Sequence, residues 1–314
     1  MNEIVEKIER AEHIVLISHI NPDGDSLGSA SAMYSYLLQK HKKVSWFCAT
    51  KEIHQRFSCI PWIESVKTSY PFGADLAISL DCANKERLGV EVACTLINID
   101  HHLTNTSFGS LNLVRSSALS TTEILYSFFK ENGVKINKKM ATALYAGLLE
   151  DSDGFLGESV DGTTFAIVQE LITQGAEFQL CNKKIMKSTS LAALRLKAVM
   201  LKDMVLEHSA TIAFFGVSYE EMKQSGAVAE DAEGALEESL FLPHVQVALL
   251  LRQRSDLSIK GSLRSSGSVN CASIALHFGG GGHPSRAGFV LKEVSSLQEA
   301  KEKVFNLIKK EIIF

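Results

Sequence analysis

Histidines and aspartates that could bind metal ions gather where three apolar runs of the chain end. Each run is short and rich in Ile and Leu, as expected of a buried strand. The carboxyl ends of parallel strands share one edge of a sheet, where open α/β sheets bind their ligands. The polar residues at or just after the ends of these runs are His19, Asp23, Asp25, Asp81, Asp100, His101 and His102.

Carboxylates crowded at one sheet edge repel one another, and a divalent cation is the simplest way to neutralise them. Imidazole and carboxylate ligands together suit Mn²⁺, Zn²⁺ or Fe²⁺ better than an all-oxygen site for Mg²⁺ or Ca²⁺. The number of candidate ligands favours two ions over one, and two ions about 4 Å apart can share a hydroxide and act on phosphorus. Three further acids, Glu150, Asp151 and Asp153, follow the apolar end of a helical run.

Taken singly, these residues have simpler interpretations. Asp25 precedes a helical run and suits an N-cap, and Asp81 suits a turn after a strand. His101 or His102 alone suits a hydrogen-bonded polar position. Their joint placement favours metal binding, because several unrelated accidents would otherwise have to fall on one sheet edge.

A glycine-rich segment near the C-terminus ends in basic residues. Four consecutive glycines cost conformational entropy, so the local geometry is expected to require bare backbone, as when N–H groups approach an anion. The alternative is a flexible loop between a helix and a strand. We expect the following residues to bind substrate phosphate: Arg264, in a preceding turn, Gly280, Gly281, Gly282, His283 and Arg286.

The elements that would position these residues alternate between strand and helix. The expected strands of the first part are 13–19, 43–48, 76–81 and 96–100, and its later helices are 120–133 and 138–151. This alternation predicts an α/β fold with a doubly wound, mainly parallel sheet. A different mixture of strands and helices follows, which predicts a second, smaller α/β domain across a cleft from the first. The expected divisions are a metal-binding domain at 1–190, a helical connector at 191–208 and a substrate-binding domain at 209–314.

Composition excludes several classes of protein. The 314 residues suffice for two domains, and the net charge of −4 does not favour long duplex nucleic acid or an anionic membrane. Residues 1–190 carry 18 basic and 22 acidic side chains, whereas residues 191–314 carry 14 of each, so the excess acid lies with the candidate metal ligands. Six scattered cysteines and the absence of a signal peptide or a long apolar run predict a cytoplasmic protein that does not span a membrane.

The motifs together resemble the DHH phosphoesterase family, in the form in which a DHHA1 domain follows the DHH domain. They span nearly the whole chain in the family's order, and the chain length resembles that of the compact oligoribonuclease branch. The matching segments are His19-Ile-Asn-Pro-Asp23-Gly-Asp25-Ser, Asp81-Cys82, Asp100-His101-His102, Gly147-Leu-Leu-Glu-Asp151-Ser152 and Gly279-Gly-Gly-Gly-His283.

The resemblance implies a role for each matching residue. One metal ion would be held by His19, Asp23 and Asp81, and a second by Asp25, Asp81, His101 and Asp151. Asp81, Asp100, His101 and His102 would form the catalytic centre, with Asp100 in support and His102 on the substrate phosphate. Asp151 is chosen over Glu150 and Asp153 because it keeps the family's spacing from Gly147, and the roles of Asp153 and Arg286 stay open.

With these motifs, the resemblance implies a two-metal phosphoesterase that uses Mn²⁺ and cleaves RNA dinucleotides and very short oligonucleotides to mononucleotides. The resemblance also implies a 3′-phosphatase activity on 3′-phosphoadenosine 5′-phosphate (pAp) as a second reaction. Hydrolysis of linear or cyclic diadenylate and a non-catalytic nucleotide sensor are the alternatives. A homodimer through the second domain is compatible with the sequence, which singles out no surface for it.

Overall fold

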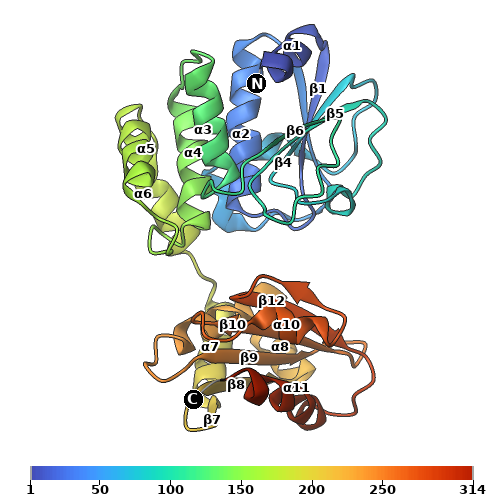
Figure 1. The fold of residues 1–314 in the computed structure, drawn as a ribbon, viewed down its shortest axis with the longest axis vertical. Coiled ribbons are helices and arrows are strands. Elements are labelled where there is room, and N and C mark those ends of the chain that lie inside the picture. Colours follow the sequence, from blue (N-terminus) through green and yellow to red (C-terminus); the bar gives the residue numbers. More distant parts are fainter. Residues whose placement is uncertain (1, 313–314) are drawn as a thin grey trace. The chain divides into compact units, whose positions relative to one another are not determined.

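A computed structural model describes residues 2–312 of the chain. The chain divides into two units, the first ending at Ser188 and the second beginning at Thr189 (Figure 1). Each unit has its own hydrophobic core. None of the helices within 2–312 is long and apolar enough to cross a membrane.

The first unit is built on a six-stranded sheet in which every strand pair is parallel. Its strand order is β3-β2-β1-β4-β5-β6. The strands are β1 (His13–Ser18), β2 (Lys43–Cys48), β3 (Val66–Lys67), β4 (Leu76–Leu80), β5 (Thr95–Asp100) and β6 (Leu111–Val114). The predicted α/β class and parallel sheet are therefore confirmed, whereas the short edge strands β3 and β6 were not predicted. The chain order reverses between β1 and β4, and ligand sites of doubly wound sheets lie at such a reversal.

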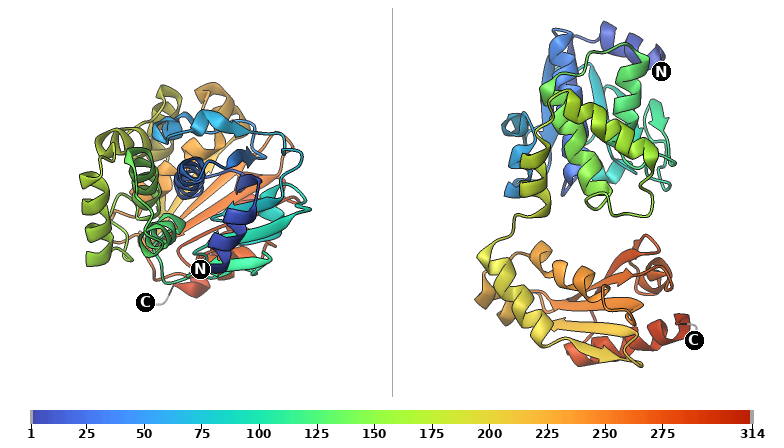
Figure 2. Two further views of the ribbon diagram at one scale, coloured as in Figure 1. Left: turned by 90° about the horizontal axis from the view of Figure 1, so that it is seen from above. Right: turned by 90° about the vertical axis from the view of Figure 1, so that its left-hand side faces the viewer.

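Helices cover one face of this sheet, and loops with short 3₁₀ turns cover the other. The helices of the first unit are α1 (Asn2–Arg10), α2 (Gly24–Gln39), α3 (Thr121–Glu131), α4 (Lys138–Asp151), α5 (Gly162–Thr173) and α6 (Phe178–Cys181). Helices α2, α3 and α4 pack side by side against the sheet (Figures 1 and 2). This arrangement brings the N-termini of α2 and α3 and the C-terminus of α4 together.

The second unit contains a mixed six-stranded sheet with the order β11-β12-β10-β9-β8-β7. Its strands are β7 (Val205–Glu207), β8 (Ile212–Val217), β9 (Val247–Gln253), β10 (Ile259–Ser265), β11 (Gly281–Gly282) and β12 (Arg286–Leu291). Only β8 and β9 are parallel among these pairs. The helices are α7 (Leu191–Lys202), α8 (Tyr219–Ser225), α9 (Gly234–Ser239), α10 (Cys271–Leu276) and α11 (Leu297–Glu311).

Helices cover both faces of the second sheet. Helices α10 and α11 pack on one face and α7, α8 and α9 on the other. The segment expected to be a connector, 191–208, forms α7 and β7, and both belong to the second unit. Leu196 and Met200 of α7 are buried in its core, which gives this helix a packing role there. Arg264, expected in a turn, lies inside strand β10.

Candidate active site

The sheet of the first unit brings the predicted ligands together in three groups. Within each group, one ligand atom per residue lies within 4.8 Å of the others. The groups are His19 with Asp23 and Asp81, Asp25 with His101 and Asp151, and Asp81 with His101 and His102. The residues come from the ends of β1, β4 and β5, the start of α2 and the end of α4. Asp100 ends β5 and lies beside the third group.

The first group lies where β1 passes into α2. His19 Nε2 is 3.5 Å from Asp23 Oδ2 and 3.4 Å from Asp81 Oδ2. Burial alone would lower the pKa of His19, but hydrogen bonds and charge from the two aspartates outweigh burial and raise the pKa to about 10. Asp23 also caps α2 by accepting a hydrogen bond from the Ser26 N–H at 3.0 Å.

The second group is held by the N-terminus of α3. Asp25 accepts hydrogen bonds from the N–H groups of Thr121 at 2.6 Å and Thr122 at 2.9 Å, and from the Thr122 hydroxyl at 2.7 Å. The alternative interpretation of Asp25 as the N-cap of its own helix is wrong, because Asp23 caps α2 and Asp25 instead accepts from the first two N–H groups of α3, almost one hundred residues away. His101 Nε2 completes the group at 3.2 Å from Asp151 Oδ2.

Asp81 joins the groups. Its carboxylate lies within 3.6 Å of His101 Nε2 and within 3.5 Å of His102 Nδ1. Asp81 also belongs to the first group, through its contact with His19. The residue adopts a left-handed backbone conformation with φ of 59°, which aspartate tolerates better than most residues. The hydroxyl of Thr121 donates a hydrogen bond to Asp81 at 3.1 Å, so α3 orients this carboxylate as well as that of Asp25.

Asp100 fixes the ring of His102. Asp100 Oδ1 lies 2.8 Å from His102 Nδ1, and the Asn105 side chain donates to the other carboxylate oxygen. Burial raises the pKa of Asp100, but the hydrogen bonds and charges of His102, Asn105 and His101 together outweigh burial and lower the pKa. Burial lowers the pKa of His102, but its hydrogen bond with Asp100 and the charges of Asp81 and Asp100 together outweigh burial and raise the pKa.

The electrostatics of the site fit divalent cations. Burial and the neighbouring charge of Asp81 raise the pKa of Asp25 to about 7. Burial and the charges of Asp25 and Asp81 raise the pKa of Asp151 well above its ordinary value. Carboxylates forced together in this way are relieved by a cation, and the mixture of imidazole nitrogens and carboxylate oxygens suits a first-row divalent metal.

The two acids beside Asp151 have other surroundings. Glu150 points to the N-terminus of α2, where it accepts a hydrogen bond from the Gly24 N–H and pairs with Arg56. Asp153 is exposed and lies beyond the end of α4, outside the three groups. Of these three acids, only Asp151 stands with the other candidate ligands within the described part of the chain.

Arg87 was not predicted, although it lies in the site. Its Nη2 is 2.8 Å from His19 Nδ1, and its charge acts on Asp23 and His102. The sequence signal was weak, since an arginine six residues after Asp81 resembles any solvated surface arginine. Only the turn after β4 brings it back beside β1.

The glycine-rich segment of the second unit owes much of its composition to close packing. A Cβ on Gly280 would lie 2.2 Å from the carbonyl oxygen of Gly288, and a Cβ on Gly282 would lie 2.4 Å from that of Arg286. Nothing lies within 4 Å of a Cβ placed on Gly281. The close approach of strand β12 is therefore enough to explain why glycine is needed at positions 280 and 282, and no bound anion is required to explain it.

The basic residues near this segment face acids of the same unit. Arg264 pairs with Glu233 at 2.7 Å, and Arg286 pairs with Glu237 at 2.7 Å. His283 is exposed, and its N–H donates to the Arg286 carbonyl oxygen at 2.7 Å.

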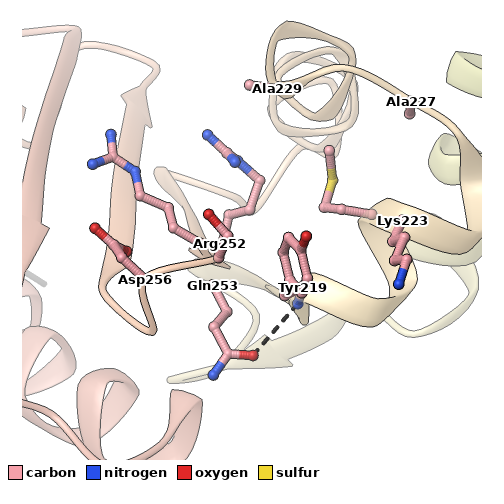
Figure 3. A pocket seen from close by; sticks show the side chains of 10 residues that line it. Tyr219, Lys223, Ala227, Ala229, Arg252, Gln253 and Asp256 are labelled. Carbon is pink, nitrogen blue, oxygen red and sulfur yellow. Dashed lines mark hydrogen bonds between the residues drawn. The ribbon is translucent and has the colours of Figure 1, made fainter.

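A separate pocket of about 440 Å³ opens beside α8 and the end of β9 (Figure 3). Tyr219, Lys223, Arg252 and Asp256 are among its lining residues, and the N–H of Tyr219 donates to the Gln253 side chain at 3.4 Å. None of the predicted substrate-binding residues lines it.

Comparisons with known proteins agree with this geometry. The N-terminal domain of the DHH family matches residues 13–148, and the DHHA1 domain matches residues 211–310. The chain is 29% identical over 304 residues to the bifunctional oligoribonuclease and PAP phosphatase NrnA of Thermus thermophilus, with coverage of 95% of this chain and 90% of the relative. It is 26% identical to the protein of the same name from Bacillus subtilis, over 91% of each chain.

A solved structure has the same fold over almost the whole chain. The crystal structure of an exopolyphosphatase-related protein from Bacteroides fragilis aligns with a TM-score of 0.91 at 26% identity, covering 99% of this chain and 95% of that one. The residues matched by the DHH domain include every member of the three side-chain groups except Asp151, which lies three residues beyond the match, and the DHHA1 domain follows in the family's order. The chain therefore belongs to the DHH/DHHA1 family of phosphoesterases, which are metal-dependent hydrolases.

Proposed function

We propose that this enzyme hydrolyses RNA dinucleotides and very short oligonucleotides to mononucleotides, and removes the 3′-phosphate of pAp. The convergence of three histidine and aspartate groups on one edge of the first sheet carries this proposal. The names of the Thermus and Bacillus relatives, which cover nearly the whole chain, support the substrate class.

The side-chain groups support two cation positions. His19, Asp23 and Asp81 would hold one ion, and Asp25, Asp81, His101 and Asp151 the other, with Mn²⁺ as the proposed metal. Bound cations would neutralise the phosphate charge and make a water molecule more acidic, which is the chemistry that hydrolysis at phosphorus needs.

The protein's own side chains would orient the reacting groups. Asp100 holds His102 so that its ring can contact the substrate phosphate, and Thr121 holds Asp81 between the two positions. In the second unit, Arg264, His283, Arg286 and the backbone at Gly280, Gly281 and Gly282 would supply donors for the substrate anion. We accordingly assign catalysis to the first unit and substrate binding to the second.

The charge distribution favours short substrates. A long polyanion needs an extended basic groove with aromatic side chains for stacking, and the net charge of −4 without a basic run does not supply one. Hydrolysis of linear or cyclic diadenylate is the second candidate, because the same site chemistry serves any small phosphodiester.

A substrate panel tests the proposal. The purified protein would be assayed with Mn²⁺ and with Mg²⁺ on an RNA dinucleotide, pAp, cyclic diadenylate, pyrophosphate and a long RNA. We expect the dinucleotide and pAp to be the best substrates and Asp81→Ala to be inactive. Equal rates on long RNA and dinucleotide would refute the size argument, and a preference for cyclic diadenylate would favour the second candidate.

A further inference from the structure

Three polar side chains share one face of strand β10 in the second unit. Lys260, Ser262 and Arg264 alternate along this strand, and alternate residues of a strand point to the same side. Ser262 and Arg264 are buried, with 4% and 9% of their surface exposed. Buried donors of this kind need acceptors.

The acceptor in this structure is the carboxylate of Glu233, which directly precedes α9. One of its oxygens accepts from the Ser262 hydroxyl at 2.8 Å, and the other accepts from Arg264 Nη2 at 2.7 Å. Its charge also acts on Lys260. A negatively charged group of the protein itself thus occupies the place where the donors meet.

Glu233 leaves the donors of Arg264 incompletely satisfied. Nη1 of Arg264 donates to the Leu263 carbonyl oxygen at 3.0 Å, but its buried Nε has no hydrogen-bond partner within residues 2–312. The carboxylate of Glu237 lies 3.8 Å from Nε, which is too far for a hydrogen bond. Both oxygens of Glu233 are already used, whereas a phosphate group offers a third oxygen and suits a guanidinium fork.

Lys260 lies beside this group, close to the neighbouring strand β12. A Cβ on Gly288 of the neighbouring strand β12 would lie only 2.7 Å from Lys260 Nζ, so the missing side chain at Gly288 gives the ammonium its place. Among the residues that the structure describes, none forms a hydrogen bond or an ion pair with this ammonium. Burial, together with the charges of nearby arginines, lowers the pKa of Lys260.

We propose that Lys260, Ser262 and Arg264 form a binding site for a phosphate group of the substrate, and that Glu233 competes for this site as an internal anion. Substrate phosphate would displace the Glu233 side chain, satisfy Arg264 Nε and take Lys260 as its third partner. This inference rests on the proposed function and adds to it a phosphate-binding lysine and a carboxylate that weakens substrate binding.

Equilibrium binding of pAp to the full-length protein, measured by titration calorimetry in a chelator, tests the inference without hydrolysis. We expect Glu233→Gln to bind pAp at least about threefold more tightly than wild type, because the competing charge is gone. Lys260→Met should bind pAp at least about tenfold more weakly, because the ammonium is gone. Gly288→Ala should weaken binding less than Lys260→Met, because the flexible lysine side chain can shift away from the added methyl group.

Glu238→Gln is the matched control. Glu238 lies in α9, the helix that follows Glu233, and pairs with Lys197, so its replacement removes an equal charge without touching the proposed site. Its affinity for pAp should stay within about twofold of wild type. Thermal melting followed by circular dichroism would verify that each variant is folded.

The direction in which Glu233→Gln changes the affinity for pAp shows whether Glu233 competes with the substrate phosphate. Unchanged or weaker binding would mean that Glu233 only positions Arg264, and would overturn the inference, as would an absence of pAp binding to the wild-type protein. A different result would refute the proposed function. If the variants changed the affinity for pAp as expected but the protein hydrolysed none of the short substrates with Mn²⁺, the proposed activity would be wrong and the phosphate-binding site would still be supported.

Discussion

Replacement of Gly147 by alanine tests how α4 and Asp25 depend on one another. Gly147 lies in α4 against the N-terminus of α3, where Asp25 is bound. A Cβ at position 147 would lie 2.5 Å from Thr122 Cγ2 and 2.7 Å from Asp25 Oδ1. Because ordinary contacts begin near 3.4 Å, the carboxylate would have to move by roughly 0.7 Å and the threonine methyl by roughly 0.9 Å.

The cost follows from the hydrogen bonds that this movement breaks. Asp25 Oδ1 accepts from the N–H and the hydroxyl of Thr122, and hydrogen bonds to a charged group contribute about 1.5 kcal/mol or more each. Alanine recovers about 1 kcal/mol through its better helix propensity. The net loss in the free energy of unfolding of the first unit is therefore about 2 kcal/mol, and a candidate metal ligand is displaced with it.

Urea unfolding followed by tryptophan fluorescence measures this loss, because both tryptophans, Trp46 and Trp62, lie in the first unit. At pH 8 in a chelator, the midpoint for Gly147→Ala should fall by about 1 M urea. Gly162→Ala is the control, since a Cβ on this first residue of α5 meets nothing within 4 Å. A Gly147→Ala protein as stable as Gly162→Ala would refute the reasoning.

Two further predictions concern the same site. Asp151→Asn should abolish metal-dependent hydrolysis while Asp153→Asn keeps it, because only Asp151 lies in a ligand group; the opposite result in a steady-state assay would show the assignment to be wrong. Burial and the charge of Asp81 raise the pKa of Asp25 from 3.8 to about 7. Between these two pH values, Asp25 keeps a proton in the folded protein that it has lost in the unfolded chain. The unfolding free energy in a chelator should therefore fall as the pH rises from about 4 to 7, and Mn²⁺ should stabilise the protein more at pH 8 than at pH 5. A urea midpoint that rises with pH over this range in a chelator would contradict the second prediction.

Local patterns predicted much of the fold. The strand at 43–48 and the helix at 138–151 have the predicted bounds, because each carries a continuous apolar or helical periodicity. The edge strands β3 and β6 and helix α9 were not predicted, since short elements carry too few residues to show a period. The segment 191–208 has helical periodicity for much of its length, but periodicity alone does not reveal that α7 packs into the second unit.

The sequence likewise predicted some contacts of the candidate sites and missed others. Side chains at the ends of parallel strands must meet at one edge, so the convergence of His19, Asp81 and His101 followed from their positions after apolar runs. The contact of Arg87 with His19 and the competition of Glu233 for Arg264 join residues that no local spacing relates.

The sequence by itself determined which residues could bind metal and which elements carry them, because apolar periodicity and strand ends are local properties of the chain. Only the tertiary structure decided which helix holds Asp25 and which carboxylate covers Arg264. Those outcomes depend on pairs of residues far apart in the chain, and their geometry is fixed when the helices and sheets pack.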